Sequence, residues 1–127
     1  VFNVNFFSAV SLVEKFKNNG LKRVLFVNSV AGKVAQKGQA QYSASKHALQ
    51  SYSETLAKHS VGLHFDVMSV NPGGIDSELW DKVKLLDKET TDNFIKPADL
   101  ACLIFSFLML PHKTYIKSAI ILPESDV

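Results

Sequence analysis

The sequence has little of what marks a disulfide-rich, membrane-spanning or nucleic-acid-binding chain. Its single cysteine, Cys102, cannot form an internal disulfide and fits a reducing compartment. The apolar run over residues 101–110 is about half the roughly 20 residues that a membrane-spanning helix needs, so a buried helix is expected there instead. A net charge of +2, without a dense Lys/Arg cluster, argues against nucleic acid as a partner.

Two further signals are missing. The four histidines show no metal-ligand spacing, so no metal site is predicted. No secretory signal is visible, and we expect a cytoplasmic protein. Because the chain opens on Val1 rather than methionine, we expect a processed product or an incomplete sequence.

The composition that remains is that of a globular domain. Of the 127 residues, 46% are hydrophobic and 20% are charged, which is enough for one domain with a core of its own. Apolar residues recur at helical spacing in some segments and form short β-rich runs in others. The expected elements are helix 4–18, strand 22–29, helix 42–60, strand 63–70, a flexible helical lid over 75–95, a helix from Pro97, and strand 115–123.

This alternation predicts an α/β fold with a doubly wound parallel sheet. In such sheets, ligands bind at the carboxyl ends of the strands. Ser29 and the segment Asn71-Pro72-Gly73 follow the first two predicted strands, so we expect both at that edge.

The stretch "SVAGKVAQKGQAQYSASK" (29–46) carries the candidate chemistry. Tyr42 and Lys46 are four residues apart on a helix and share a face. An ammonium beside a phenol favours the phenolate, which a tyrosine needs for acid–base catalysis near neutral pH. Ser29 could hydrogen-bond the same substrate oxygen. The alternative interpretation is structural: Tyr42 packs in the core, Lys46 is solvated and Ser29 caps a loop.

Four short motifs together resemble the carboxyl-terminal half of a classical short-chain dehydrogenase/reductase. "VLFVNSVAG" resembles the strand that carries that family's catalytic serine, here Ser29. "YSASK" matches its Tyr-x-x-x-Lys motif, and "NPGGIDS" resembles its Pro-Gly loop. "VNFFSA" resembles the start of the helix that carries its asparagine, here Asn5, for which a helix N-cap is the structural alternative.

The resemblance implies an NAD(P)-dependent oxidoreductase that moves a hydride between a nicotinamide and an alcohol or carbonyl carbon. Tyr42 would transfer the proton, Lys46 would assist it and bind the ribose, Ser29 would polarise the carbonyl, and Asn5 would hold a relay water. The cofactor, NADP or NAD with a slight preference for NADP, would also contact Pro72, Gly73, Ile75 and Ser77. A small-molecule alcohol or carbonyl compound is the implied substrate, and a homodimer or homotetramer the implied assembly.

One part of the family pattern has no counterpart here. Nothing resembles the Gly-x-x-x-Gly-x-Gly turn that binds the pyrophosphate. We therefore expect residues 1–127 to form the carboxyl-terminal half of a single Rossmann-fold domain, without the amino-terminal dinucleotide-binding half. The alternative is a truncated, inactive remnant that acts as an oligomerisation or binding module. The ending "IKPADLACLIFSFLMLPHKTYIKSAIILP" resembles NADP-dependent 3-hydroxy-acid dehydrogenases and related general reductases.

Overall fold

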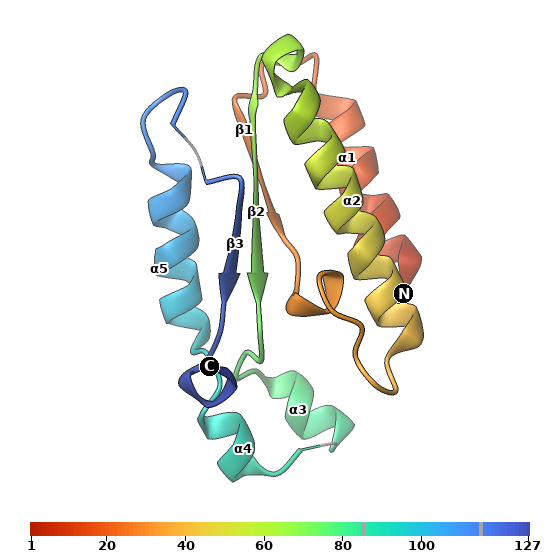
Figure 1. The fold of residues 1–127 in the computed structure, drawn as a ribbon, viewed down its shortest axis with the longest axis vertical. Coiled ribbons are helices and arrows are strands. Elements are labelled where there is room, and N and C mark those ends of the chain that lie inside the picture. The colour runs from red at the N-terminus through yellow and green to blue at the C-terminus, as the bar shows by residue number, and fades with distance from the viewer. Residues whose placement is uncertain (85, 115) are drawn as a thin grey trace.

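A computed structural model describes residues 1–84, 86–114 and 116–127, with the backbone alone for 60–63. Its centre is a parallel sheet with the strand order β1-β2-β3 (Figure 1). The strands are β1 (Arg23–Val27), β2 (Asp66–Pro72) and β3 (Ser118–Ile121). The predicted α/β class with a parallel sheet and flanking helices is confirmed.

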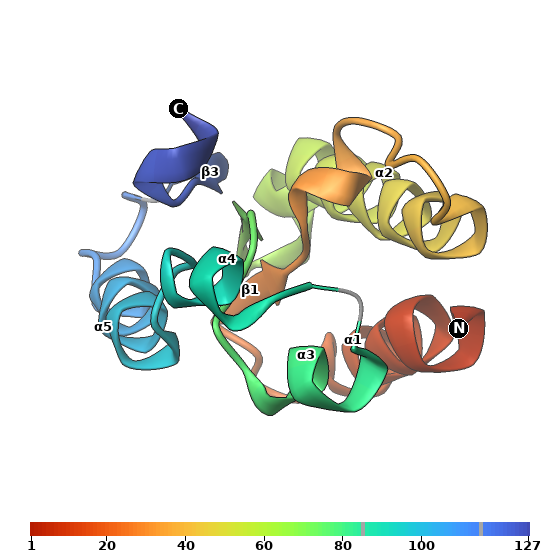
Figure 2. The ribbon, with the colours of Figure 1, turned by 90° about the horizontal axis from the view of Figure 1, so that it is seen from below.

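The helices lie on both faces of the sheet and below its carboxyl edge. Figure 2 shows α1 and α2 on one face and α5 on the other, with α3 and α4 at the edge where the strands end. The elements are a π-helical turn (Asn3–Phe7), α1 (Ser8–Phe16), α2 (Ala40–Leu63), α3 (Glu78–Val83), α4 (Lys88–Asp92), α5 (Pro97–Leu108) and two 3-10 turns (Val30–Gly32, Glu124–Asp126).

The main core lies between the sheet and the pair α1 and α2. Alternate residues of a strand face opposite sides of a sheet, so one set of side chains meets these helices. One stripe of α2 faces this core: Ser45 and Leu49 are buried, and Tyr52 and Leu56 are half-buried. The core cluster consists of Val13, Phe26, Leu49, Phe65 and Val67.

The opposite face is more open than the sequence suggests. Leu100 is the buried residue of α5, whereas Phe105 is 65% exposed and Met109 66% exposed. Cys102 is exposed as well, so the expectation of a buried helix is wrong in this structure. The helix is apolar around most of its circumference, but only one side meets the sheet. In the described ranges, no helix is long and apolar enough to cross a membrane.

Several predicted boundaries shift. α2 continues through Leu63 and ends at His64, which adopts the left-handed conformation (φ 62°), so the second strand starts at Asp66 and not at 63. That strand also extends through Pro72, because Asn71 and Pro72 still pair with β3. The third strand is shorter than the predicted 115–123, and Tyr115 lies outside the described residues.

The predicted helical lid contains two short helices, α3 and α4. Ile75 and Ile95 form a parallel bridge at its base, so the lid starts and ends at the same place beside β2. α3 and α4 lie between these two residues, and Leu85 lies outside the described residues.

Arg23 makes hydrogen bonds that connect the amino ends of β1 and β2 with the segment that follows α5. Its guanidinium donates to the Asp66 carboxylate at 2.7 Å and to the carbonyls of Leu108, Leu110, Pro111 and Thr114 at 2.7 to 3.3 Å. Carbonyls at the end of a helix need such donors, because no helical N–H follows them. One side chain thus joins β1, β2 and the carboxyl end of α5.

Candidate active site

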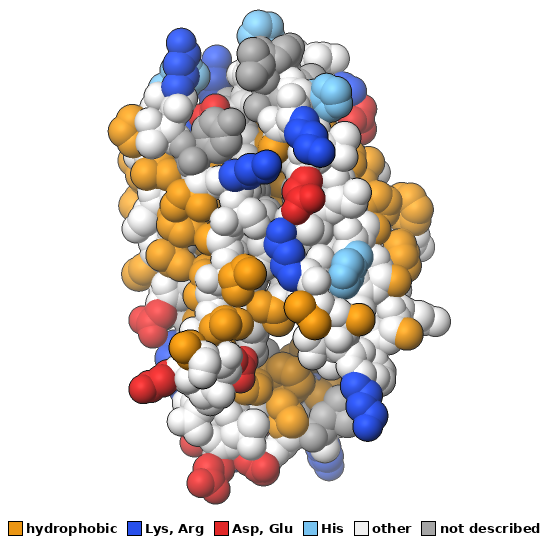
Figure 3. Space-filling view, viewed as in Figure 1, with side chains coloured by type: hydrophobic (Ala, Val, Ile, Leu, Met, Phe, Trp, Pro, Cys, Tyr) orange, Lys and Arg blue, Asp and Glu red, His pale blue; other side chains and the backbone are white. Residues whose placement is uncertain are grey.

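A cavity of about 780 Å³ lies where the strands end. In Figure 3 a hollow with apolar side chains at its floor lies in the region where Figure 1 places α3. Its size is within the usual range of small-molecule sites. The lining residues are Ser29, Val30, Ala31, Gln36, Gln39, Tyr42, Gly73, Gly74, Leu79, Trp80, Val83, Phe94 and Asp126. Two of the predicted catalytic residues, Ser29 and Tyr42, therefore share this cavity with Gly73.

Ser29 caps the 3-10 turn that follows β1. Its Oγ accepts a hydrogen bond from the Ala31 N–H at 3.1 Å, as the structural interpretation of this serine predicts. A serine hydroxyl has one donor and two acceptor positions. Since the cap uses an acceptor position, the O–H can still donate to a ligand in the cavity.

The turn carrying Ser29 is held close against α2. A Cβ atom at Gly32 would lie 2.7 Å from both the Lys46 carbonyl oxygen and Asn28 Nδ2, so only glycine fits there without a shift. Asn28, which is buried, donates to the Lys46 carbonyl at 3.2 Å and to Gln50 at 3.1 Å. This contact fixes the strand end that holds Ser29 beside the helix that holds Tyr42 and Lys46.

Tyr42 and Lys46 occupy the first turns of α2 and contact each other. The Lys46 ammonium lies 5.7 Å from the centre of the Tyr42 ring. Lys46 is half-buried, so it is not the solvated lysine of the structural alternative. Burial lowers the pKa of Lys46, because removal from water disfavours the charged ammonium.

Asn5 is hydrogen-bonded to α2 and does not cap a helix. It lies inside the π-helical turn, and its Nδ2 donates to Ser45 Oγ at 3.1 Å. Ser45 is fully buried and donates in turn to the Tyr42 carbonyl at 2.7 Å. The N-cap alternative is therefore wrong, and Asn5 is linked to the backbone of Tyr42 through one hydroxyl.

The predicted cofactor contacts lie at different places around the cavity. Pro72 is buried at the end of β2, and Gly73 lines the cavity. Ile75 lies at the base of the lid, where its carbonyl accepts a hydrogen bond from Trp80. Ser77 lines a neighbouring hollow with Asp76 and Glu78. The structure thus brings Ser29, Tyr42 and Gly73 together, with Lys46 against Tyr42, but gives Ser77 no place in their cavity.

An aromatic pair, whose Phe94 the sequence did not single out, forms the lid side of the cavity. The rings of Trp80 and Phe94 meet edge to face with centres 5.6 Å apart. Trp80 Nε1 donates to the Ile75 carbonyl at 2.7 Å, so this side chain packs on its own loop and lines the cavity as well. A Cβ atom at Gly74 would come within 2.8 Å of the Phe94 ring. The second glycine of "NPGG" was the available signal, because it allows the ring to lie on the backbone.

A family model described as short chain dehydrogenase matches residues 1–87. The chain belongs to the short-chain dehydrogenase family. It is 32% identical over 96 residues to a probable short-chain type dehydrogenase/reductase, VdlC, of Helicobacter pylori, covering 72% of this chain and 35% of that protein. It is 30% identical to a diacetyl reductase [(S)-acetoin forming] of Staphylococcus epidermidis, covering 100% of this chain and 58% of that protein. The chain thus spans about a third of the length of the first relative and a little more than half of the second.

Solved structures share the Rossmann-like fold at low sequence identity. A short-chain dehydrogenase/reductase of unknown function from Caenorhabditis elegans, solved with cofactor, has a TM-score of 0.81 at 19% identity and covers 98% of this chain and 54% of its own. A short chain dehydrogenase from Escherichia coli, solved with NADPH, has a TM-score of 0.76 at 19% identity. The match covers 98% of this chain and 52% of that one. A 3-ketoacyl-(acyl-carrier-protein) reductase from Brucella melitensis, solved with NADH, has a TM-score of 0.76 at 22% identity. The match covers 98% of this chain and 55% of that one.

Proposed function

We propose that this chain carries the catalytic residues of an NAD(P)-dependent oxidoreductase that interconverts an alcohol and a carbonyl compound. The observation that carries the proposal is the shared cavity, which Ser29 and Tyr42 line together at the carboxyl edge of a parallel sheet. Family membership supports the same reaction class.

In this proposal, each side chain has a distinct task. The Tyr42 hydroxyl gives its proton to the substrate oxygen during reduction and takes it back during oxidation. The Ser29 O–H donates a hydrogen bond to the same oxygen and stabilises the charge that develops there. Lys46 places a positive charge against the Tyr42 ring and so favours the phenolate. Asn5 positions this end of α2 through Ser45.

The cavity fits the nicotinamide end of a dinucleotide. Ser29, Tyr42 and Gly73 line it together, so a nicotinamide in the cavity would lie beside the proposed proton donor. Tyr42, Lys46, Pro72, Gly73 and Ile75 would hold that end, whereas the assignment of Ser77 rests on the resemblance alone. A bound nicotinamide supplies or accepts the hydride. The neighbours' cofactors include both NADPH and NADH, so the preference for NADP stays a prediction.

The remaining part of the cofactor would bind to a second half of the domain. The outer edge of β1 pairs with no strand in the described part of the chain, and Val27 at its end is 46% exposed. Such an edge is a place for another strand to pair. We propose residues 1–127 as the carboxyl-terminal half of one Rossmann-fold domain, as the sequence predicts.

Replacement of Tyr42 tests this function in the full-length protein. Tyr42→Phe keeps the ring against Lys46 but removes the proton donor, so kcat for ketone reduction should fall about 100- to 10,000-fold. Tyr52→Phe, on the same helix but packed against the core cluster, is the matched control and should leave kcat within about twofold. Near wild-type turnover of Tyr42→Phe would refute the proposed role. A wild-type protein inactive with both NADH and NADPH would favour the inactive binding module.

A further inference from the structure

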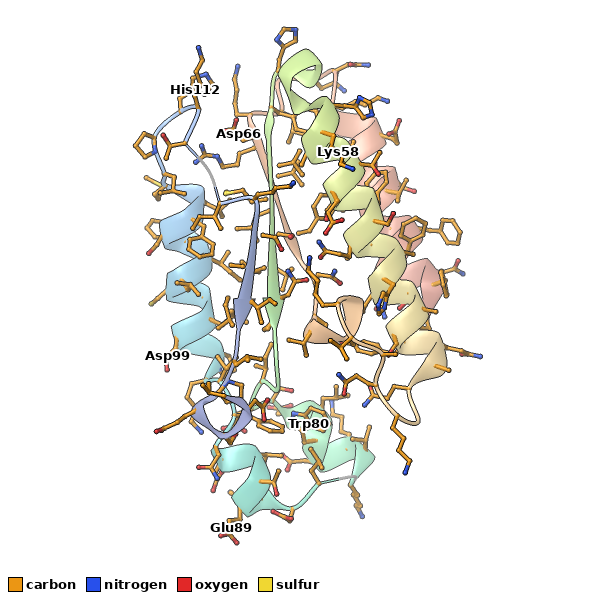
Figure 4. The ribbon with its side chains drawn as sticks, viewed as in Figure 1. Lys58, Asp66, Trp80, Glu89, Asp99 and His112 are labelled. Atoms are coloured by element: carbon orange, nitrogen blue, oxygen red, sulfur yellow. The ribbon has the colours of Figure 1, made fainter. Side chains whose placement is uncertain are left out.

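Beyond the predicted catalytic residues, the cavity has an apolar wall on one side and a carboxylate on another. Its lid side is apolar, with Leu79, Trp80, Val83 and Phe94 together on or beside α3 and α4. Figure 4 shows Trp80 on this lid side, below the carboxyl ends of the strands. Aromatic rings offer a large contact area to an apolar group, and flat groups pack well against them.

The only acidic residue among the described lining residues is Asp126, and none of them is Lys, Arg or His. The 3-10 turn Glu124–Asp126 brings it to the cavity, because the Asp126 N–H bonds back to the Pro123 carbonyl at 2.9 Å. A Cβ atom at Gly73 would lie 3.2 Å from Asp126 Oδ2, so the carboxylate sits directly against the backbone of the cavity wall.

The nearby lysines are engaged elsewhere or lie outside the lining. Lys33 donates to Glu54 at 3.0 Å, and Lys46 lies against the Tyr42 ring. An anionic substrate would therefore meet Asp126 without a matching cation along the described lining, and like charges a few ångströms apart repel each other. A neutral substrate would avoid this repulsion at Asp126 and would gain the contact with the apolar wall.

From these observations we infer that the substrate is an uncharged carbonyl compound with an aromatic or other bulky apolar group, and that Asp126 excludes carboxylate-bearing analogues. This inference rests on the proposed function for its kinetic consequences. It runs against a hydroxy-acid substrate, which the ending of the chain suggests by resemblance. Asp126 is a specificity-determining residue in this view and takes no part in proton transfer.

A matched substrate pair tests the inference in the full-length protein: methyl benzoylformate, which is neutral, and benzoylformate, which carries a carboxylate on the same skeleton. We expect kcat/KM for the ester to exceed that for the acid by about tenfold or more. Asp126→Asn keeps the size of the side chain and removes its charge. This variant should lower the ester-to-acid ratio at least about threefold, mainly through better use of the acid.

The control variant is Glu124→Gln, which removes a charge from the same turn at a residue that does not line the cavity. It should leave the ratio unchanged. A wild-type preference for the acid, or an equal ratio in Asp126→Asn and wild type, would overturn the inference and leave the oxidoreductase function intact.

Binding supplies a readout that does not need turnover. Trp80 lines the cavity, so a ligand against the lid should change its fluorescence, and Trp80→Phe identifies its share of the signal. Quenching by the ester but not by the acid would support the inference even if neither ketone is reduced, a result that would remove the proposed function alone. No Trp80-dependent response to the ester, or a stronger response to the acid, would overturn the inference.

Discussion

The two ends of the same three strands are built differently. At the amino ends, Arg23 fills its hydrogen-bonding capacity with Asp66 and four backbone carbonyls. At the carboxyl ends, Ser29 keeps a free O–H, two glycines line the wall, and a cavity remains. Figure 4 shows this separation, with Asp66 and His112 near one end of the molecule and Trp80 near the other.

The difference shows how a small sheet can hold a reactive site. Satisfied polar groups at one end fix the relative positions of the strands and α5. The other end can then keep donors and space available for a ligand. We therefore expect substitutions at the amino end to change stability, and substitutions at the carboxyl end to change activity.

The largest effect on stability should come from Arg23→Leu. It would leave Asp66 without its ion pair, although both side chains are only 12 to 14% exposed, and would remove the donors to α5. Breaking a buried pair from one side is costly, and we expect the free energy of unfolding to fall by about 3 kcal/mol. Chemical denaturation of the full-length protein measures this loss.

The double variant Arg23→Leu/Asp66→Leu should recover part of that stability, because no unpaired charge remains. KM of each variant that still folds should stay within about twofold of wild type, since neither residue lines the cavity. A large KM change with little loss of stability would contradict the division between the two ends.

Gly32→Ala should lower both stability and activity, because it disturbs the packing that positions the site. The added methyl group would lie 2.7 Å from the Lys46 carbonyl, so the turn with Ser29 must move away from α2. A misplacement of this kind can lower kcat by about tenfold or more. Steady-state kinetics and thermal unfolding of the same samples separate the two effects.

Gly38→Ala is the control in the same connection. Gly38 has φ 77° with open space around its Cβ position, so alanine there strains only the backbone. Stability should fall modestly while kcat stays near wild type. Equal losses of kcat in both variants would mean that loop strain, and not the close approach at Gly32, controls the position of Ser29.

A smaller effect, of opposite sign, is expected for Lys46→Met. Burial lowers the pKa of Lys46, so the folded state disfavours the charged amine that the unfolded chain carries. Below the folded-state pKa this cost is fully present, and it disappears as the pH rises through that pKa toward the unfolded value. At pH 7 we expect Lys46→Met to raise Tm by about 2 °C while lowering kcat.

The pH dependence sharpens this prediction. The Tm advantage of Lys46→Met over wild type should shrink as the pH rises toward 10. Lys58→Met, at an exposed position of the same helix, should show neither the gain in Tm nor its pH dependence. A lower Tm for Lys46→Met at pH 7 would show that the contact with the Tyr42 ring outweighs the cost of burying the charge.

The smallest expected effect on the folded subunit comes from a surface substitution on α2 that tests the oligomeric state. On α2, Ala44, Ser51 and Thr55 are exposed and Ala48 is half-buried, so this row of small residues does not pack on the sheet. A partner helix could approach it closely, which supports the predicted homodimer or homotetramer. Ser51→Arg should shift the full-length protein toward monomer in sedimentation experiments, whereas Lys58→Arg should not. A monomeric wild type at micromolar concentration would refute the prediction.

The elements and the shared helix of Tyr42 and Lys46 could be predicted because their signals are local. Apolar spacing indicated α2 and its buried stripe, and the spacing of Tyr42 and Lys46 placed both on one helix. The wall of the cavity could not be predicted, since Phe94 reaches Trp80 only through a close approach at Gly74 that a sequence does not show. The same holds for Asp126, which depends on how the last turn packs on Gly73.

Parallel pairing gives this fold a particular assembly problem. Arg23 and Asp66 are paired neighbours 43 residues apart in the chain, and Asn71 reaches Ala119 across 48 residues. Each strand pairing therefore closes a long loop before it gains a contact, and such non-local topologies fold slowly. α2 can form early from local interactions, but the cavity exists only after both loops have closed. Tyr42 thus sits on a helix that can form before the strand ends around it assemble.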